Sequence, residues 1–600
     1  MSRARTLILA GALGLALIDG SHPRLVGDGG EYLVMALNLA GLHHPGVAPL
    51  NIDALHRRAT AIDERLATWE IRDTTVSAPD GRRDFVHFWV YPLLAVPGIW
   101  VAQLTGVTPL AGFTILNAAL LGLALWICLP RLGGALALLL FGGPIIWWID
   151  KAHTEAFSFA LLAIAFASLR DRPWWSLTAA GLASTQNPPM TLLVPLMGIV
   201  CPVATPALAK DRRFWIGLAT GLALALLQPA YTYLRHGTVS LLLQTTDRHL
   251  PPPAELLVAP LDPAIGLAGN FPVFVILVVA ALALLIARRH WLDAGAVVAL
   301  TSGAAFLVSF TQTSNLHHGA TPGMSRYALW LIPLGIPSLR LAWDLGGAVF
   351  HRSVWTAAVV SAATMTFAFH PRIDEYTAEP SPLARWLWTR HPGWNNPLPE
   401  VFVEIMNGPG ERRFVPVATT QCGKVLTVGR NDGSAFPIPC YPPVMPPECR
   451  AAGALCYANR TGTHFDFVKA PGSPSTQEGF TYQPGAVWPA AALPHVRKLL
   501  TDAQWWTLEQ KVQGEDIVRE THDVRVLELE GPRRLVLVLR GAGAEAYVAL
   551  RPPWPMKGLM MDAVTGQTLR SLQFDGEPFS RWQFDLPAGD RLLLVWLWGT

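Results

Sequence analysis

The sequence predicts an α-helical polytopic membrane protein that carries a C-terminal, mainly-β domain outside the membrane. The chain of 600 residues is 51% hydrophobic and 15% charged, whereas soluble domains carry about 25% charged residues. Apolar runs dominate to about residue 370, and beyond it none reaches the ~20 residues that a bilayer span needs. The net charge of +3 is too small to indicate nucleic-acid binding.

About 11 apolar segments are predicted to cross the membrane. They are residues 5–18, 108–128, 132–149, 155–169, 174–186, 190–206, 213–233, 271–287, 291–310, 327–345 and 353–369. The apolar run 87–104 is left out, because Pro92 and Pro97 interrupt a helix interior. We expect this run to be re-entrant or to lie on the outer surface.

Basic residues set the expected orientation. Arg3 and Arg5 place the N-terminus in the cytoplasm, and the later basic clusters fall on the same side only if 87–104 does not cross. An odd number of spans then places the C-terminal domain on the opposite side. We therefore expect a multi-pass protein of the bacterial inner membrane, with a periplasmic C-terminal domain.

Three regions follow from this topology. Residues 1–370 form the membrane domain, with a large first outer loop at 19–107. Residues 371–410 are rich in Pro and Trp and are predicted to form an interfacial linker helix. Residues 411–600 are predicted to form a β-sandwich, because runs such as VRVLELEG, RRLVLVLRG, AYVALR and DRLLLVWLWG alternate and are separated by turn residues.

The six cysteines divide between the two halves. Cys128 and Cys201 lie in apolar runs, which is typical of packing residues. Four more cluster in the C-terminal region without a CxxC or a nearby histidine pair, which favours disulfides over zinc. The expected pairs are Cys449 with Cys456 and Cys422 with Cys440.

The first outer loop contains an unusual acidic stretch, VGDGGEYL. Asp28, Glu31 and Tyr32 stand at i, i+3 and i+4, so in a helix they share one face. An apolar stripe in the following residues favours a helix lying in the membrane interface. The alternative is that Asp28 serves only as the N-cap of that helix. GDGG lacks the spacing and the lysine of a phosphate-binding loop.

Two further outer loops carry polar residues. Asp150, His153 and Glu155 are candidates for a metal or acid/base cluster, unless Lys151 pairs with Asp150 in a solvated turn. Asn187 either binds a sugar hydroxyl or satisfies backbone carbonyls freed by the neighbouring prolines.

Arg326 and Tyr327 begin the tenth predicted span, on its outer side. A guanidinium there opposes the positive-inside trend, and a lipid phosphate is a natural bidentate partner for it. Contact with phospholipid headgroups is the alternative interpretation.

Taken together, these motifs resemble the GT-C superfamily of polytopic glycosyltransferases, over roughly residues 1–370. The superfamily includes lipid A aminoarabinose transferases and protein O-mannosyltransferases. Asp28 to Tyr32 is similar to the acidic motif in the first outer loop of the superfamily, and HFWVYPLL is similar to a proline-containing stretch in the same loop. HTEAFSFALL is similar to a later acidic motif, and SRYALWLIP is similar to the lipid-phosphate site of the superfamily. Gly29 stands where the superfamily usually has a second acid, and Glu31 is the neighbouring acid.

The resemblance implies transfer of a sugar from a polyprenyl-phosphate donor to a glycan, lipid or protein acceptor at the outer face of the membrane. An inverting transfer needs a carboxylate base, a role that falls to Asp28 with Glu31 beside it. Arg326 and Tyr327 would then bind the donor phosphate. The candidate substrate-binding residues are Tyr32, His87, Asp150, His153, Glu155 and Asn187. No cofactor is expected with certainty, and a divalent metal is left open.

Two alternative functions from other classes would need the same residues but would catalyse no reaction. A transporter or flippase for a lipid-linked sugar would need the acids and the arginine for binding alone. A non-catalytic protein of envelope assembly would need them only for structure. The sequence shows no internal repeat of the kind that many transporters carry.

Overall fold

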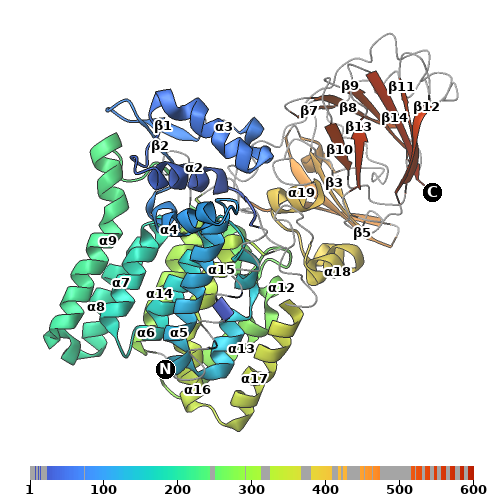
Figure 1. Ribbon diagram of the computed structural model, residues 1–600. Helices are drawn as coiled ribbons and strands as arrows, with labels where there is room; N and C mark the ends of the chain where they lie inside the picture. The colour runs from blue at the N-terminus through green and yellow to red at the C-terminus, as the bar shows by residue number, and fades with distance from the viewer. Residues whose placement is uncertain are drawn as a thin grey trace.

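The computed structural model describes residues 23–69, 71–72, 74–242, 250–290, 292–312, 324–365 and 380–407 almost completely. Before them it describes residues 7, 11, 12 and 14, and after them 417–419, 423–428, 446–472 without 452 and 463, and strands between 515 and 599. This part of the chain is mostly helical, and its larger sheets lie in the C-terminal region (Figure 1).

Each predicted apolar segment from residue 108 onward contains all or part of at least one helix, and further helices lie between the segments. The described helices up to residue 363 are α2 (Gly29–Ala40), α3 (Ile52–Ile62), α4 (Val90–Leu104), α5 (Ala111–Phe141), α6 (Glu155–Ser168), α7 (Pro173–Ser184), α8 (Leu193–Ala204), α9 (Arg212–His236), α10 (Pro253–Leu256), α11 (Val258–Leu261), α12 (Leu267–Asn270), α13 (Pro272–Ala287), α14 (Ala294–Phe310), α15 (Arg326–Leu334), α16 (Ile336–Leu345) and α17 (Ala348–Ala363). The predicted segment 5–18 falls almost entirely outside the described residues.

Two differences from the predicted spans have local causes, a glycine in one and Pro337 in the other, because Pro337 has no N–H to donate to the carbonyl of Pro333. α5 covers most of two of them and changes direction at Gly133, whose φ of 74° and ψ of 171° are not helical. The predicted segment 327–345 forms α15 and α16, which meet at Gly335.

The run 87–104 forms a helix in spite of its two prolines, and its expected position at the outer surface stays a prediction. α4 runs from Val90 to Leu104 and contains both Pro92 and Pro97. Pro92 lies in the first turn, where its missing N–H would have no intrahelical partner, so only Pro97 opposes the helix.

Among the described residues, α5 and α9 are long and apolar enough to cross a membrane. Five further apolar stretches of helix have 10–17 residues: Val90–Leu104, Glu155–Ser168, Pro188–Ala204, Pro272–Ala287 and Ala294–Phe310. Large apolar side chains on several of these helices face outward. Ile276 and Val279 of α13 are 65% and 60% exposed, and Leu300 of α14 is 55% exposed.

α2 is a helix, as predicted, but protein covers it on all sides and its apolar stripe is not exposed. Its residues from Gly29 to Asn38 are all buried, including Leu33 and Val34 on the side away from the predicted stripe. α3 and α4 pack against it (Figure 1). The helix is therefore enclosed by α3 and α4, which holds the acidic motif inside the protein.

A hairpin between α3 and α4 is fixed to the end of α9. β1 (Thr75–Ser77) and β2 (Arg83–Phe85) are antiparallel. Asp84 of β2 accepts hydrogen bonds from Arg235 at 2.5 Å and His236 at 2.8 Å, and Asp80 in the turn pairs with Arg235 at 2.9 Å. These ion pairs join the loop that carries the acidic motif to a helix more than 120 residues further along the chain.

α4 and α5 approach each other closely through two glycines. A Cβ added at Gly98 would lie 2.6 Å from the carbonyl oxygen of Gly112, and one added at Gly112 would lie 2.6 Å from the amide nitrogen of Ile99. Two residues without side chains allow this close contact between the helix backbones. The contact fixes α4, and therefore the residues just before it, against the helical core.

The predicted linker helix of residues 371–410 forms two helices, α18 (Pro382–Arg390) and α19 (Pro399–Asn407). Their buried side chains share one core with residues of the helical part and of the first C-terminal sheet. The core includes Val258, Ile265, Trp388, Phe402, Leu426 and Tyr457. Trp394, between the two helices, is 71% exposed.

The first C-terminal sheet has the order β3-β4-β5-β6 and is antiparallel. Its strands are β3 (Val417–Ala418), β4 (Lys424–Val428), β5 (Leu455–Thr461) and β6 (His464–Lys469). The predicted disulfide between Cys449 and Cys456 is confirmed. Cys422 and Cys440 lie outside the described residues.

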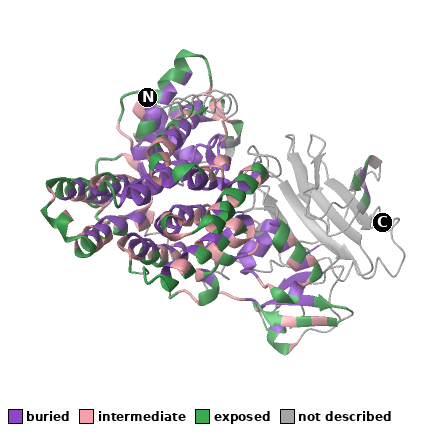
Figure 2. Ribbon diagram, turned by 90° about the horizontal axis from the view of Figure 1, so that it is seen from below, coloured by how far each residue is buried: buried purple, intermediate pink, exposed green. Residues whose placement is uncertain are grey.

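The last strands form a six-stranded antiparallel sheet of order β12-β11-β14-β9-β8-β7 and a pair, β10-β13. They are β7 (Glu515–Arg519), β8 (His522–Leu529), β9 (Arg534–Arg540), β10 (Ala546–Leu550), β11 (Met556–Asp562), β12 (Thr568–Phe574), β13 (Trp582–Leu586) and β14 (Leu592–Gly599). The four alternating runs named above form β8, β9, β10 and β14, as predicted. Most of the residues drawn as buried lie in the helical part (Figure 2).

Candidate active site

The carboxylate of Asp28 is the centre of a polar cluster. Asp28 precedes α2, but its side chain makes no capping hydrogen bond. Its Oδ2 atom instead accepts a hydrogen bond of 3.0 Å from Nη1 of Arg326 and lies 3.5 Å from Nε2 of both His87 and His153. The interpretation of Asp28 as only an N-cap is therefore wrong.

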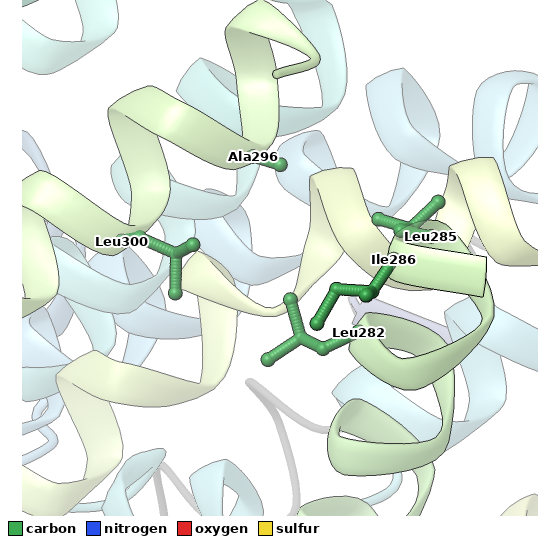
Figure 3. Close-up of a pocket in the computed structure, with 5 residues that line it drawn as sticks. All are labelled: Leu282, Leu285, Ile286, Ala296 and Leu300. Atoms are coloured by element: carbon green, nitrogen blue, oxygen red, sulfur yellow. The ribbon is translucent and has the colours of Figure 1, made fainter. Parts of the chain in front are cut away.

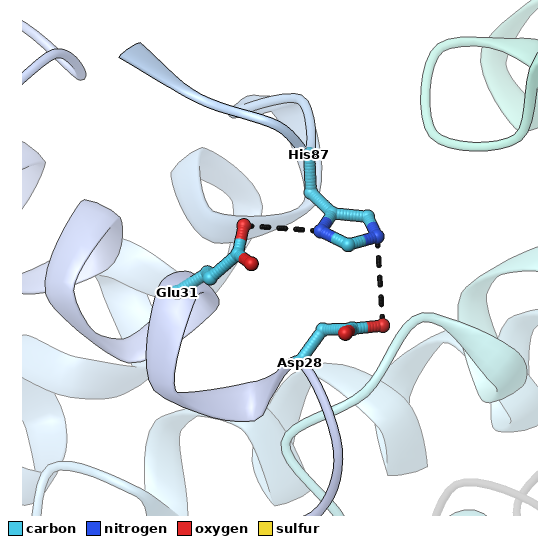
Figure 4. A group of neighbouring side chains, drawn as sticks. All are labelled: Asp28, Glu31 and His87. Atoms are coloured by element: carbon cyan, nitrogen blue, oxygen red, sulfur yellow. Dashed lines mark hydrogen bonds and ion pairs between the residues drawn. The ribbon is translucent and has the colours of Figure 1, made fainter. Parts of the chain in front are cut away.

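Glu31 and His87 complete one side of the cluster. Nδ1 of His87 lies 3.0 Å from Glu31, so the imidazole bridges the two carboxylates from the loop before α4 (Figure 4). Ligand atoms of Asp28, Glu31 and His87 all lie within 4.8 Å of one another. Two carboxylates and an imidazole are a donor set that suits a divalent transition metal.

Backbone pairing explains how His153 reaches Asp28. The amide of Arg24 donates to the carbonyl of Asp150 at 2.8 Å, and the amide of Ala152 donates to the carbonyl of Arg24 at 3.0 Å. The chain before α2 thus runs beside the loop before α6, which places Asp28 and His153 at the ends of two paired segments.

The loop before α6 is buried, so the expectation of a solvated turn is wrong. Asp150 is 3% exposed and Lys151 is fully buried. Asp150 pairs with Lys151 at 3.4 Å, and also with Arg24 at 2.8 Å, which directs its carboxylate away from Asp28. Arg24 is a partner that the sequence analysis missed.

His153, Glu155 and Arg326 form the other side of the cluster. Nε2 of His153 lies 2.8 Å from Nη1 of Arg326, and Nδ1 lies 3.2 Å from Glu155. The second oxygen of Glu155 accepts a hydrogen bond from the indole of Trp330. Trp330 follows Arg326 by four residues in α15, and this spacing on one helix face was the available sequence signal.

Aromatic rings form the inner wall of the cluster. Tyr32 makes edge contacts with His87, Tyr91 and His153, with ring centroids 5.5–5.7 Å apart. The hydroxyl of Tyr91 donates to Asn117 at 3.0 Å.

Asn117 of α5 holds the loop before α6 in place. Its amide nitrogen donates to the backbone carbonyls of Trp148, Ile149 and Lys151 at 3.3, 3.2 and 2.8 Å. A single amide inside a predicted apolar span was the sequence signal for this role, and the sequence analysis did not use it.

The charges of the cluster shift its pKa values in opposite directions. Burial raises the pKa of Asp28, but His87, Arg326 and His153 outweigh it and hold the pKa well below its usual range. Burial also raises the pKa of Glu31, and there His87 only partly offsets it. Burial lowers the pKa of His87, whereas Asp28 and Glu31 raise it more, to about 9. At neutral pH the cluster therefore holds an ionised Asp28 and a protonated His87.

Gly29 is required by packing. A Cβ at this position would lie 2.9 Å from the carbonyl oxygen of Ala152, in the paired loop. A larger residue there would separate the two segments that bring Asp28 and His153 together. Glu31, two residues after Gly29 in α2, supplies the second carboxylate of the cluster instead.

Two predicted site residues lie apart from Asp28, and one lies at the edge. Asp150 belongs to the pair with Arg24, and the amide of Asn187 donates to Ser158 at 2.6 Å. Tyr327 stacks on Phe310 with ring centroids 4.7 Å apart, beside Arg326.

A separate cavity of about 410 Å³ lies between α13 and α14 (Figure 3). Its lining consists of Leu282, Leu285, Ile286, Ala296 and Leu300, which carry no polar side-chain atom. This cavity therefore offers no group for catalysis.

In comparisons with known proteins, no family model, no curated protein and no solved structure matches the chain. Any assignment of function thus depends on the residues of the cluster and on their surroundings.

Proposed function

We propose that this protein is a membrane glycosyltransferase that moves a sugar from a polyprenyl-phosphate donor to an acceptor at the outer face of the bacterial inner membrane. The observation that carries the proposal is the meeting of Asp28, His153 and Arg326 around one carboxylate oxygen. These residues come from three segments that the predicted topology places on the same side of the membrane.

Exposed apolar side chains support a membrane location. Soluble proteins rarely expose large contiguous apolar patches, yet Ile276, Val279 and Leu300 are more than half exposed on apolar helices. Lipid would cover these side chains. The two helices long enough to span a bilayer, α5 and α9, agree with this location.

The reaction we propose exchanges one glycosidic bond for another. The acceptor oxygen forms a bond to the anomeric carbon of the sugar, while the bond from that carbon to the donor phosphate oxygen breaks. Asp28 takes the proton of the acceptor hydroxyl, and the lipid phosphate leaves with the bonding electron pair. Arg326 offers the leaving phosphate a cation in a partly buried position, where charge stabilisation is strong.

The contact between Arg326 and Asp28 fits a site that responds to its donor. A carboxylate beside two cations, Arg326 and the protonated His87, is a weak base, because its pKa is low. A donor phosphate that binds Arg326 removes one of these partners from Asp28. The pKa of Asp28 then rises, and the carboxylate becomes a better base only when the donor is present.

Glu31 and His87 orient Asp28 in this scheme. The protonated imidazole contacts both carboxylates and keeps them at a fixed separation. If a divalent ion is used, Asp28, Glu31 and His87 are the residues that would hold it, and it would add positive charge for the departing phosphate.

The test uses purified protein and a polyprenyl-phosphate sugar with a radioactive label in the sugar. We expect the wild type to release lipid phosphate and to transfer the label when extracts of the bacterial envelope are added as acceptor. Asp28→Asn should abolish both. The matched control is Asp53→Asn, in the same loop, whose side chain is 76% exposed.

A transporter or flippase would bind the donor and release no lipid phosphate. A structural protein of the envelope would neither bind nor cleave it. Either result with folded wild-type protein contradicts the proposal.

A further inference from the structure

A polar cavity, distinct from the apolar one between α13 and α14, lies where the C-terminal region meets the helical part. It measures about 230 Å³ and lies among α11, the residues between α18 and α19, and the end of β6. Leu257, Leu261 and Pro471 give it apolar surface, and Asp262, Asn395 and Asn396 give it polar surface. The described residues of the Asp28 cluster do not line this cavity.

Neighbouring donors fix the orientation of both asparagine side chains. Nζ of Lys424 donates to Oδ1 of Asn396 at 2.6 Å, and the indole of Trp388 donates to Oδ1 of Asn395 at 2.7 Å. An indole N–H can only donate, and Oδ1 of Asn396 also accepts from the amide nitrogen of Asn459 at 3.0 Å. The oxygen of each amide must therefore face the protein.

The two amide nitrogens remain for a ligand. Asn395 and Asn396 are half-buried, and neither amide nitrogen has a partner within the part of the chain that the structure describes. Each NH₂ group is a double donor. Two adjacent donors of this kind suit a molecule with several acceptor oxygens.

Lys424 holds this arrangement from inside the protein. It is fully buried, also bonds Asn459, and lies with its ammonium 4.6 Å from the ring centre of Tyr457. Asn459 in turn donates to Asn396 at 3.0 Å. The amide of Asn396 is thus held by two donors and cannot rotate without losing both.

We propose that this cavity binds one neutral pyranose unit of a carbohydrate. Pockets for drug-sized ligands measure about 300–1,000 Å³. At about 230 Å³ this cavity is smaller, and its size suits a single sugar ring. Asp262 in the lining disfavours an anion, whereas hydroxyl groups can accept from the asparagines. Leu257 and Leu261 supply the apolar surface that the C–H face of a sugar covers.

A short series of hydrogen bonds links the lining of the cavity to the candidate active site. Asp262 accepts from the amides of Ala264 and Ile265 at 2.7 and 3.0 Å, and the carbonyl of Ile265 accepts from the amide of Ser325 at 2.8 Å. Ser325 directly precedes Arg326. A sugar held here would belong to the acceptor, an assignment that rests on the proposed function, whereas binding itself does not.

Saturation-transfer NMR on the full-length protein in detergent tests the proposal, with the methyl pyranosides of glucose, galactose, mannose and arabinose as probes. We expect at least one probe to bind the wild type. Asn396→Asp keeps an oxygen facing Lys424 but replaces the NH₂ donor, so it should weaken binding at least tenfold without lowering the melting temperature. Leu257→Trp, at a position 47% exposed, should block the cavity.

Asn51→Asp is the matched control, because it makes the same change at an exposed position outside the cavity. If none of the four probes binds the wild type, the proposal is overturned. It is also overturned if both Asn396→Asp and Leu257→Trp bind the probe as the wild type does. Asp28→Asn should bind the probe like the wild type. Sugar binding without any transferase activity would therefore contradict the proposed function and leave this proposal intact.

Discussion

The guanidinium of Arg326 lies 3.0 Å from the carboxylate of Asp28, although 298 positions separate the two residues in the chain. The same nitrogen lies 2.8 Å from His153. A carboxylate and an imidazole from two loops and a guanidinium from the start of α15 thus form one charged centre. The electrostatics of any one of them depends on the other two.

Arg326→Ala should weaken binding of the donor. Charged hydrogen bonds contribute about 1.5–3 kcal/mol, so we expect KM for the polyprenyl-phosphate sugar to rise about tenfold to 100-fold. Arg72→Ala, at a position 63% exposed in the same outer region, is the control and should behave like the wild type. An unchanged KM in Arg326→Ala would remove the phosphate role. The measurement is initial transfer rate against donor concentration.

The stability of the protein should decrease as the pH rises through 9. The pKa of His87 is about 9 in the folded protein, against about 6.5 in an unfolded chain. Because the folded value is the higher one, the protonated imidazole stabilises the folded state fully below pH ~6.5, and this contribution disappears as the pH rises through 9. Its upper limit is about 3 kcal/mol, before screening by solvent.

His87→Gln should remove this dependence. We expect the melting temperature of the wild type to fall between pH 7 and pH 10, and that of His87→Gln to change less. His43→Gln, at an exposed position, is the control and should follow the wild type. Equal pH dependence in wild type and His87→Gln would contradict the ion pairs of His87 with Asp28 and Glu31.

Asn117→Ala should destabilise the loop that carries His153. The change leaves the buried carbonyls of Trp148, Ile149 and Lys151 without their donor, at a cost of about 1–3 kcal/mol. Thr114→Val is a matched control in the same helix, because the buried Thr114 hydroxyl has no hydrogen-bond partner among the described residues. Thermal unfolding should show a lower melting temperature for Asn117→Ala alone. Transfer activity should fall with it.

Gly29→Ala should destabilise the site although it adds one methyl group. The new Cβ would lie 2.9 Å from a backbone oxygen of Ala152, which cannot move as a flexible side chain would. We expect a loss of about 1–3 kcal/mol. Gly347→Ala, where a Cβ meets nothing within 4 Å, should be tolerated. Normal stability and activity in Gly29→Ala would show that the two paired segments can separate without consequence.

Local patterns in the sequence predicted most of the helices and several strands. Apolar runs located α6, α13 and α14 within a few residues, and alternation located β8 and β9. The candidate residues Asp28, Glu31, His87, His153 and Arg326 were also identified, because charged residues beside apolar runs are conspicuous. Their chemical roles remain predictions.

The partners of these residues could not be predicted from the sequence. The diversion of Asp150 to Arg24 depends on backbone pairing between two loops. The burial of α2 on all sides depends on α3 and α4, and the apolar stripe of its sequence was equally consistent with a membrane surface. Both errors arose where tertiary packing, and not local propensity, decides the environment.

The close contact of Gly98 with Gly112 links helix packing to proton chemistry. α4 begins three residues after His87, so a wedge between α4 and α5 would displace the imidazole from Glu31 and Asp28. The protonation of Asp28, which precedes α2, thus depends on the close packing that Gly98 allows in α4. A larger residue at Gly98 or Gly112 should therefore alter the pH–rate profile of the protein.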